Sequence, residues 1–438
     1  MRISFCRSLQ QRSLWRCIGV AAFLIVNYML LPIPLCSADE AAIMEELQAL
    51  KARITVLEAQ LAQHSEQSMR TEERMTKVES VPNIFEGVDI DAGATFIMQG
   101  THNANGDNQL SDGNDVTDAS YSVDLGIEKT FGERDKAFIH LEAGGGNGVE
   151  DELALFSNVN YDADNDENVR LSEAWYEHYF DGMPRTLTFG KIDATNYIDI
   201  NEYANDEQSQ FLGRIFGNSS AIEFPSYAAG VRFAVEPVDF LDAEFVAMEA
   251  DSDWEDAFDE MFAATQLNIK PQLFDRGGNY RFIAWVNDRD HTKWLDQAII
   301  TKASYGFGVS FDQELTDVLG VFLRYGWQNP EVFLNGESFS LEQSWSTGIQ
   351  LSGSLWNRKD DVLGLAIGQA IPSGDYKNSN TELNAYAETH LETYYRYFVN
   401  EHLTVSPDIH IIWDPYGDDA VMGDDTIGVF GMRAQVDF

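Results

Sequence analysis

From residue 88 to the C-terminus, apolar and polar residues alternate along most of the chain. In the stretch 88–99, VDIDAGATFIMQ, one set of alternate positions is largely apolar and the other is largely polar. A period of two is that of a β-strand whose two faces meet different surroundings. Roughly sixteen such runs follow one another, separated by loops rich in Asp, Asn and Gly. They include the stretches 121–128, 137–144, 185–193, 228–249, 279–290, 303–328, 344–371, 384–413 and 426–438.

The first 38 residues have a different pattern, which predicts a signal peptide. Four arginines lie between positions 2 and 16 without an acid, and the apolar stretch CIGVAAFLIV follows. Small residues at Cys36 and Ala38 fit a cleavage before Asp39. Two alternatives stay open, a lipoprotein acylated on Cys36 and a retained anchor helix. The predicted consequence is export.

Residues 39–81 carry an apolar repeat of seven residues, which predicts a helical coiled coil. Within 43–61 the apolar residues are spaced by four and three in turn, and RITVLE (53–58) resembles a trimerisation signature. A single amphipathic helix packed on a domain is the alternative. Pro82 ends the helix, and we expect one domain from there to residue 438.

Two architectures produce so many two-faced strands. A soluble β-sandwich or barrel buries its apolar faces in a core, whereas an outer-membrane barrel turns them to lipid. Export, the high strand number and the aromatic residues near strand ends favour the second. The predicted fold is all-β, a transmembrane antiparallel β-barrel of about 16 strands, preceded by the N-terminal coiled coil.

The final strand supports this prediction. Phe430, Met432, Ala434, Val436 and Phe438 form its apolar face, and the chain ends on an aromatic residue. Outer-membrane barrels commonly end in this way, and the barrel-insertion machinery reads the terminal aromatic. We expect this strand to close the barrel against the strand near Val88, which leaves no unpaired edge.

Composition excludes several function classes. The formal net charge of −43 argues against nucleic acid and anionic lipid headgroups as partners. All three cysteines lie in the first 36 residues, so the rest of the chain has neither disulfides nor a cysteine metal site. Neither a G-x-S-x-G nucleophile motif nor a glycine-rich phosphate loop is present. We therefore expect no enzyme and no cofactor.

If the apolar set faces lipid, the alternate residues face a water-filled lumen. Charges of both signs there suit polar, uncharged solutes, and an aromatic ring beside them can stack on a sugar ring. The alternative is that these groups only solvate the wall, as in any such barrel. The pore-lining and substrate-contacting candidates are Arg232, Arg281, Trp285, Asn287, Arg324, Glu392, Arg396, Asp408 and Arg433.

Two stretches resemble one known family. The first is LTFGKIDATNYIDINEYANDEQSQFL (187–212), in which a strand ends in Gly-Lys-Ile-Asp and a loop with Asp, Asn and Tyr-Ala follows. The second is ETHLETYYRYFVNEHLTVSPDIHIIWDPYG (388–417). Together with the last strand, they resemble the OprB-like family of carbohydrate-selective outer-membrane porins. Two features depart from the family pattern, His410 in place of Gln and the strong acidity.

The resemblance implies a sixteen-stranded barrel that admits mono- and oligosaccharides and is narrowed by loops folded inward. Residues 194–216 are the expected constriction loop, because the segment is too long for a hairpin turn and rich in polar residues. An exposed loop that caps the mouth is the alternative. The candidate constriction residues are Asn196, Asp199, Asn201, Glu202, Asn205 and Asp206.

A further acidic stretch, residues 162–173, carries acids at four calcium-loop positions but lacks the glycine of the sharp turn. We expect an exposed acidic loop there, without a bound metal.

These observations predict an outer-membrane channel for passive diffusion of small hydrophilic solutes, with sugars as the expected substrates. The alternative is a general or cation-preferring porin without sugar selectivity, because the chain is so acidic. Expected partners are outer-membrane lipid and lipopolysaccharide, the insertion machinery and two further copies of the chain in a homotrimer. The coiled coil is expected in the periplasm.

Overall fold

The computed structural model describes residues 86–438, apart from 107–112, 164–167, 183–184, 257–258 and 302, together with positions 48, 51–53, 55 and 59. The chain divides into two compact units, Met1–Ile84 and Phe85–Phe438. The described positions of the first unit are helical and exposed. The predicted signal peptide and most of the predicted coiled coil lie outside the described residues. Among the described residues, no helix is both long and apolar enough to cross a membrane.

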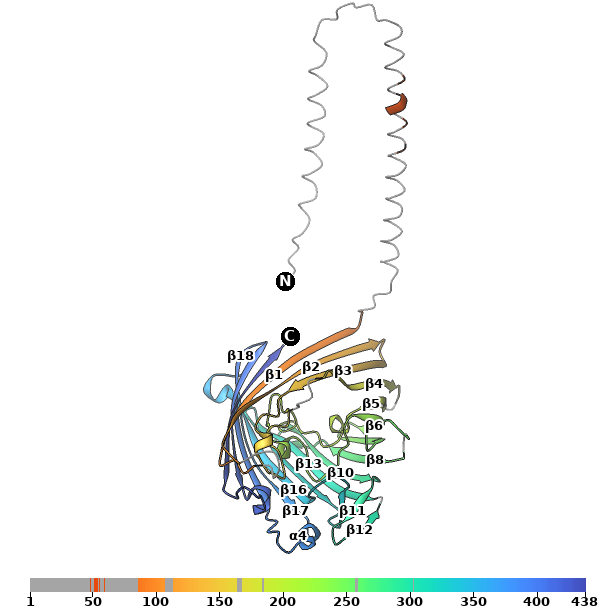
Figure 1. The fold of residues 1–438 in the computed structure, drawn as a ribbon. Coiled ribbons are helices and arrows are strands. Elements are labelled where there is room, and N and C mark those ends of the chain that lie inside the picture. Colours follow the sequence, from red (N-terminus) through yellow and green to blue (C-terminus); the bar gives the residue numbers. More distant parts are fainter. Residues whose placement is uncertain are drawn as a thin grey trace, which may run out of the picture. The chain divides into compact units, whose positions relative to one another are not determined.

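Long antiparallel strands form the second unit (Figure 1), and each pairs with its neighbours in chain order. The last strand also pairs with the first, from Gly93↔Asp437 to His102↔Gly428, so the sheet closes into a barrel. Within the described residues, sixteen strands make up this barrel. They are β1 (Val88–His102), β2 (Thr117–Phe131), β3 (Asp135–Gly145), β4 (Arg170–Phe180), β5 (Arg185–Ile192), β6 (Ala228–Val238), β7 (Leu241–Glu249), β8 (Met261–Ile269), β10 (Arg276–Asn287), β13 (Ser304–Thr316), β14 (Leu319–Gln328), β16 (Leu341–Ser352), β17 (Val362–Pro372), β18 (Glu388–Asn400), β19 (Leu403–Trp413) and β20 (Ile427–Asp437).

The remaining elements lie in the connections. The two-residue strand β9 (Gln272–Leu273) pairs with the start of β10. A separate small sheet has the order β12 (Asp296–Thr301), β11 (His291–Lys293), β15 (Val332–Leu334). Short helices are η2 (Glu150–Glu152), η3 (Ala194–Asn196), α3 (Arg214–Gly217), η4 (Gly353–Trp356), α4 (Gly374–Ser379) and η5 (Pro415–Asp418).

The alternation along the strands separates an apolar outer face from a polar inner one. Phe282, Tyr305 and Phe430 on the outer face are 45%, 52% and 58% exposed, whereas the inward Arg281 and Arg433 are 5% and 1% exposed. A soluble barrel would show the opposite distribution, because it would hide its apolar faces in the core. The predicted barrel with an apolar outer face is therefore confirmed.

The two ends of the barrel differ in the length of their connections. At one end the turns are short, such as 132–134 between β2 and β3 and 401–402 between β18 and β19. At the other end the connections are long, and two of them, 146–169 and 193–227, each exceed twenty residues. Strand β1 begins and β20 ends at the end with short turns.

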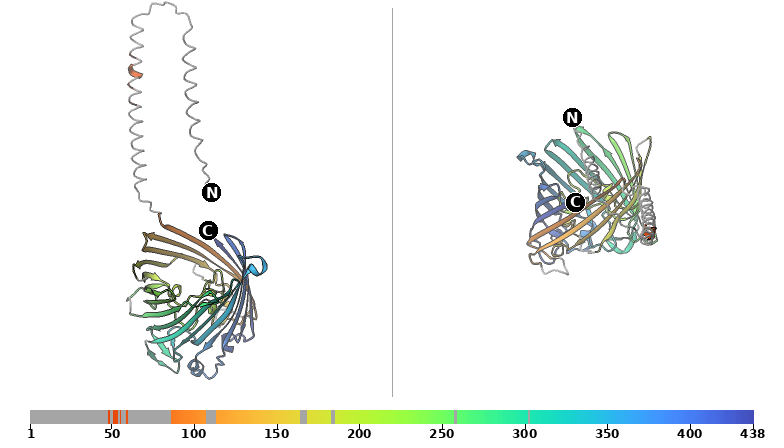
Figure 2. Two further views of the ribbon diagram at one scale, coloured as in Figure 1. Left: turned by 180° about the vertical axis from the view of Figure 1, so that it is seen from behind. Right: turned by 90° about the horizontal axis from the view of Figure 1, so that it is seen from above.

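Both long connections fold into the barrel, as Figures 1 and 2 show. We call residues 146–163 the first inner segment and residues 193–227 the second inner segment. The first contributes Val149 and Val159 to a core with the inward faces of β19 and β20. The second packs Ile198 and Ile222 against the inward faces of β7, β8 and β10. These cores explain why parts of the inner wall are apolar.

Candidate functional site

The second inner segment leaves the wall at the Gly-Lys-Ile-Asp sequence. Gly190 has a φ of +141°, and a Cβ there would lie 2.3 Å from the carbonyl oxygen of Ala174, so only glycine fits. Asp193 then caps the short helix η3, and its carboxylate accepts from the backbone N–H and the hydroxyl of Thr195, both at 2.8 Å. These local interactions turn the chain into the lumen at the end of β5.

Buried side chains of the opposite wall hold the second inner segment in place. Arg324 on β14 donates to the carboxylate of Asp199 at 2.9 Å and to the carbonyl oxygens of Asp199, Ala204 and Phe216 at 2.9, 3.0 and 2.6 Å. Both Arg324 and Asp199 are almost fully buried, at 1% and 0% exposed. Burial raises the pKa of Asp199, and the Coulombic attraction of Arg324 opposes this effect.

Inward-facing glutamates of β18 form a second set of anchors. Glu392 accepts from the backbone N–H groups of Leu212 and Gly213 at 2.6 and 2.9 Å. Glu388 accepts from the backbone N–H groups of Phe156 and Ser157 in the first inner segment, at 2.8 and 3.0 Å. Each carboxylate thus satisfies two backbone amides of an inner segment, which would otherwise lack a partner, and Glu388 also accepts from the N–H of Tyr416 at 2.8 Å.

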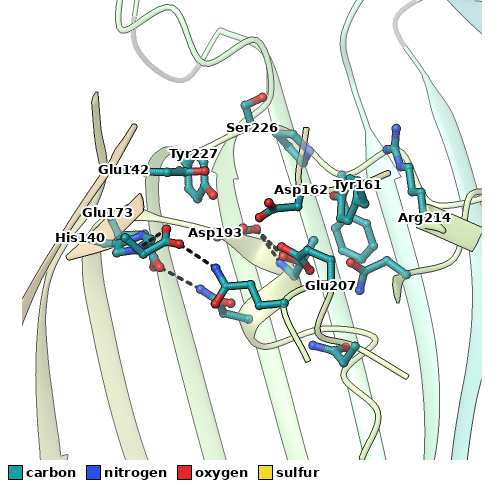
Figure 3. A pocket seen from close by; sticks show the side chains of 18 of the residues that line it. His140, Glu142, Tyr161, Asp162, Glu173, Asp193, Glu207, Arg214, Ser226 and Tyr227 are labelled. Atoms are coloured by element: carbon teal, nitrogen blue, oxygen red, sulfur yellow. Dashed lines mark hydrogen bonds and ion pairs between the residues drawn. The ribbon is translucent and has the colours of Figure 1, made fainter. Parts of the chain in front are cut away.

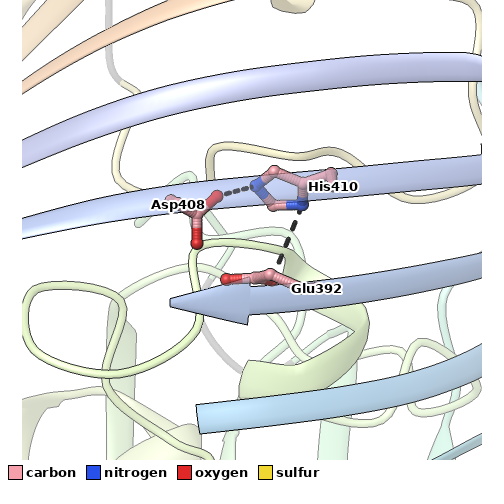
Figure 4. A group of neighbouring side chains, drawn as sticks. All are labelled: Glu392, Asp408 and His410. Atoms are coloured by element: carbon pink, nitrogen blue, oxygen red, sulfur yellow. Dashed lines mark ion pairs between the residues drawn. The ribbon is translucent and has the colours of Figure 1, made fainter. Parts of the chain in front are cut away.

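Glu392 also belongs to a buried cluster with Asp408 and His410 on β19 (Figure 4). His410 Nε2 lies 2.6 Å from Asp408 Oδ1, and its Nδ1 lies 3.7 Å from Glu392 Oε2. These residue types can bind a divalent cation, and their ligand atoms lie within 4.8 Å of one another. Both oxygens of Glu392 are already engaged by backbone amides, however, so we interpret the cluster as an anchor of the second inner segment.

A cavity of about 550 Å³ remains between the inner segments and the wall of β2, β3 and β4 (Figure 3). It is one part of the lumen that the inner segments leave open. Its wall side consists of Asp124, His140, Glu142, Arg170 and Glu173. Its inner-segment side includes Tyr161, Asp162, Asp193, Asn196, Asn205, Glu207, Gln208, Arg214, Asn218, Phe224 and Tyr227.

Acidic residues dominate the lining of this cavity. Six carboxylates, Asp124, Glu142, Asp162, Glu173, Asp193 and Glu207, face two arginines, Arg170 and Arg214, and one histidine, His140. Arg170 forms a bidentate pair with Glu142 at 3.0 and 3.2 Å. The cavity therefore keeps an excess of negative charge.

Burial raises the pKa values of the acidic residues that the inner segments contribute to the cavity. It raises the pKa of Asp162 to about 7 and the pKa of Glu207 to about 8. It also raises the pKa of Asp193, although the hydrogen bonds from Thr195 oppose the shift. The charge of the cavity therefore depends on pH in the neutral range.

Six of the predicted pore-lining residues lie beneath the inner segments. They face inward, but at 0–5% exposure they do not reach open water. Trp285, expected to stack on a sugar ring, instead packs on Phe262 with ring centroids 6.2 Å apart. The prediction that these six residues contact solutes directly is corrected. They belong to the packed wall, because the two inner segments cover this side of it. The six are Arg281, Trp285, Arg324, Glu392, Asp408 and Arg433.

The other three pore-lining candidates have different surroundings. Arg232 pairs with Glu244 at 2.8 Å and lines a second cavity, of about 230 Å³, near the short-turn end. Asn287 is as deeply buried as those six, at 2% exposure, but it donates to Glu223 at 3.1 Å at the border of a third cavity, of about 200 Å³, near the long-loop end. Arg396 is half-buried on the inward face of β18.

The predicted constriction loop lies inside the barrel, and its six candidate residues divide into three pairs. Asn196 and Asn205 line the large cavity. Asp199 and Asn201 point to the wall, where Asn201 donates to Ser310 Oγ at 3.2 Å. Glu202 and Asp206 are exposed. The alternative of a loop that caps the mouth from outside is wrong, because the loop contacts inward-facing residues such as Arg324.

Sequence reasoning missed the first inner segment. Asp162 was expected in an exposed acidic loop, but it lines the cavity and accepts from the Ser122 hydroxyl at 2.9 Å. The available signal was the apolar content of residues 149–159, where Val149, Phe156 and Val159 are too apolar for a loop in water. Tyr161, Arg214 and Tyr227 were missed because they lie in irregular segments without a period.

Comparisons with known proteins agree with this architecture. Residues 46–438 match the family described as "Carbohydrate-selective porin, OprB family". The high-pH structure of Pseudomonas putida OprB has a TM-score of 0.68 and 17% sequence identity, and the match covers 81% of this chain and 94% of that one. The outer-membrane channel DcaP of Acinetobacter baumannii has a TM-score of 0.51 and 14% identity, with 81% and 98% covered. These structural likenesses support the fold alone.

A sequence relative was also found. An uncharacterized protein of Aquifex aeolicus (strain VF5) is 23% identical over 228 residues. The match covers 51% of this chain and 58% of the length of that relative.

Proposed function

The chain belongs to the OprB family of carbohydrate-selective porins, and from this premise we propose that it is an outer-membrane channel through which small sugars diffuse passively. Porins of this family are channels rather than known enzymes. We propose that this chain likewise needs neither catalysis nor a cofactor, because a concentration gradient suffices to drive diffusion. In bacterial outer-membrane barrels, short turns face the periplasm and longer loops face outward.

The observation that carries the proposal is the large polar cavity inside the closed barrel. At about 550 Å³ it lies in the size range of small-molecule sites. Carboxylates, amides and tyrosine hydroxyls around it can exchange hydrogen bonds with sugar hydroxyls. The ring faces of Tyr161, Phe224 and Tyr227 can pack against the C–H groups of a sugar.

Two of the three cavities adjoin one another on the proposed route, and the third lies near the short-turn end without sharing a lining residue with them. The cavity near the long-loop end and the large cavity share Arg214, Phe224 and Pro225. The cavity near the short-turn end is lined by Arg232, Glu244 and Lys270. A solute would enter among the long loops, pass the large cavity and leave at the short turns.

Planar-bilayer recording tests this function. Glucose added on one side should reduce the single-channel potassium current in a saturable manner, because a sugar in the constriction excludes ions. Tyr227→Ala should weaken this block, whereas Phe180→Ala on the outer face should not. Currents indifferent to glucose and to a panel of other sugars would refute the sugar channel.

The acidic lining favours a second candidate function, a cation-preferring porin without sugar selectivity. Under a salt gradient, the reversal potential of such a pore would be displaced from zero toward the equilibrium potential of potassium. It would not respond to glucose. Both functions would use the same acidic lining, so ion preference does not distinguish them. Block of the current by sugar does.

We propose three partners beyond the solute. The coiled coil of residues 39–81 is proposed to hold a homotrimer in the periplasm, and the short-turn position of the start of β1 supports that side. Phe438, 78% exposed with its N–H bonded to the Ala92 carbonyl at 2.9 Å, is proposed as the recognition element of the insertion machinery. The apolar outer face is proposed to contact outer-membrane lipid and lipopolysaccharide.

A further inference from the structure

The acids of the large cavity have few cationic partners. Asp124 accepts from the Gln208 amide at 2.7 Å and lies 3.2 Å from His140. In the described part of the chain, the carboxylates of Asp162, Glu173 and Asp193 accept hydrogen bonds from neutral donors. These are the Ser122 hydroxyl for Asp162, the Trp175 indole and Asn196 amide for Glu173, and Thr195 for Asp193. A solute cation would therefore find acceptors that form no direct ion pair with an arginine or lysine among the described contacts, although Arg433 attracts Asp162 at longer range.

The two arginines of the cavity are held against aromatic rings. The guanidinium of Arg170 lies 5.6 Å from the centre of the Tyr227 ring, and that of Arg214 lies 5.5 Å from the centre of the Tyr161 ring. Arg170 is also paired with Glu142. Both arginines keep their charge, but two guanidinium groups facing six carboxylates leave the acidic excess in place.

A second observation, independent of the acids, points to a ligand. The side chain of Asn218 lines the cavity at 8% exposure, and its amide nitrogen Nδ2 has no hydrogen-bond partner. A buried amide donor without a partner costs free energy unless an acceptor arrives. The hydroxyl or ether oxygen of a polyol is a suitable acceptor, and a bare metal ion is not.

We propose that this cavity favours polyhydroxylated solutes that carry a protonated amine, such as amino sugars, over uncharged sugars, and that it disfavours sugar acids. The proposal rests on the proposed function of a sugar channel and names its preferred substrate class. An ammonium group offers three donors to the carboxylates, and the hydroxyl oxygens of the same solute accept from Asn218. A solute carboxylate would meet more carboxylates than cations in the lining of the cavity.

Three linear six-carbon polyols that differ mainly in charge test the proposal at pH 8, namely N-methylglucamine, sorbitol and gluconate. Reversal potentials in planar bilayers give the permeabilities of N-methylglucamine and gluconate relative to potassium and chloride. Block of the potassium current compares N-methylglucamine with sorbitol. We expect N-methylglucamine to permeate at least about 10-fold better than gluconate and to block at lower concentration than sorbitol, in line with focusing by a charged cleft.

Variants connect the preference to the cavity. Glu207→Gln combined with Asp162→Asn keeps the shape of both side chains but removes two ionisable carboxyl groups, and should lower the preference for N-methylglucamine about 3-fold or more. Glu133→Gln, in the exposed turn after β2, is the matched control and should leave it unchanged. Asn218→Ala should weaken block by both N-methylglucamine and sorbitol.

The outcomes separate this inference from the proposed function. Equal permeation of N-methylglucamine and gluconate, with block by sorbitol and glucose intact, would overturn the amine preference and leave the sugar channel standing. Absence of block by every polyol and sugar would overturn both. Strand content by circular dichroism, equal to that of the unaltered protein, shows that each variant is folded.

Discussion

Arg324 on the barrel wall and Asp199 in the second inner segment form a buried ion pair at 2.9 Å across 125 residues of sequence. Asp199 has a φ of +65°, a conformation that costs free energy for a residue other than glycine. The backbone there turns so that its carbonyl oxygen also accepts from Arg324. This relationship fastens the second inner segment to the wall of the barrel.

Arg324→Met should loosen the second inner segment. It leaves the Asp199 carboxylate buried and unpaired, which costs about 3–5 kcal/mol in comparable cases. We expect a larger and noisier single-channel conductance and a lower unfolding midpoint. Arg134→Met, in an exposed turn pair with Asp181, is the control and should change neither quantity. An unchanged conductance in Arg324→Met would contradict the role assigned to this pair.

Glu392→Gln should weaken the second anchor of the same segment. A glutamine amide has one oxygen, so one of the two N–H groups of Leu212 and Gly213 loses its acceptor. The expected loss is about 1–3 kcal/mol of unfolding free energy, measured by denaturant titration in detergent. Glu401→Gln, at an exposed turn, serves as the control. Equal midpoints for both variants would remove Glu392 from the anchors.

Cation selectivity should increase as the pH rises from 6 to 9. The pKa of Asp162 is raised to about 7 and that of Glu207 to about 8 by burial, so both are largely protonated at pH 6. Each becomes negatively charged as the pH passes its pKa. Reversal potentials under a potassium chloride gradient measure the effect. In Glu207→Gln combined with Asp162→Asn the pH dependence should flatten, and a profile as steep as that of the unaltered protein would assign it to other groups.

Removal of Tyr161 or Tyr227 should weaken sugar block more than it changes conductance. An aromatic contact contributes about 0.5–1.5 kcal/mol beyond buried area, which corresponds to roughly a 2- to 10-fold change in affinity. Concentration series of glucose block in Tyr161→Ala and Tyr227→Ala measure it. A block constant within error of the original would show that the rings do not contact the sugar.

Deletion of residues 39–81 should convert trimers to monomers while the barrel stays folded. The seven-residue repeat there is proposed to join three copies. Cross-linking and light scattering in detergent give the oligomeric state. A second variant, in which serine replaces the apolar residues of the repeat at unchanged length, shows whether the repeat itself joins the copies. A trimer of unchanged stability after the deletion would show that the barrels associate through their own walls.

Much of the barrel could be predicted from the sequence because strand alternation is a local property. Each residue of a strand takes the face opposite to its neighbour, so the period of two assigned Phe430 to the outside and Arg433 to the inside. The roughly sixteen runs gave the strand number, and the Gly-Lys-Ile-Asp sequence marked where the chain turns into the lumen.

The candidate site could be predicted only in part. Residues 194–216 were expected in the constriction, and Asn196 and Asn205 do line the cavity. The alternation along a strand shows which face a side chain takes, however, and it does not show what covers that face. Trp285 and Arg324 therefore looked like pore-lining residues, although the second inner segment covers them.

The sequence by itself determined the two-faced strands, their number, the closing terminal strand and the point where the second inner segment begins. Only the tertiary structure decided which inward-facing groups meet water, because that depends on contacts between residues far apart in the chain. Glu392 and Leu212 are separated by 180 positions, and no local pattern records that one binds the other. The open lumen is the space inside the barrel that this long-range packing does not fill.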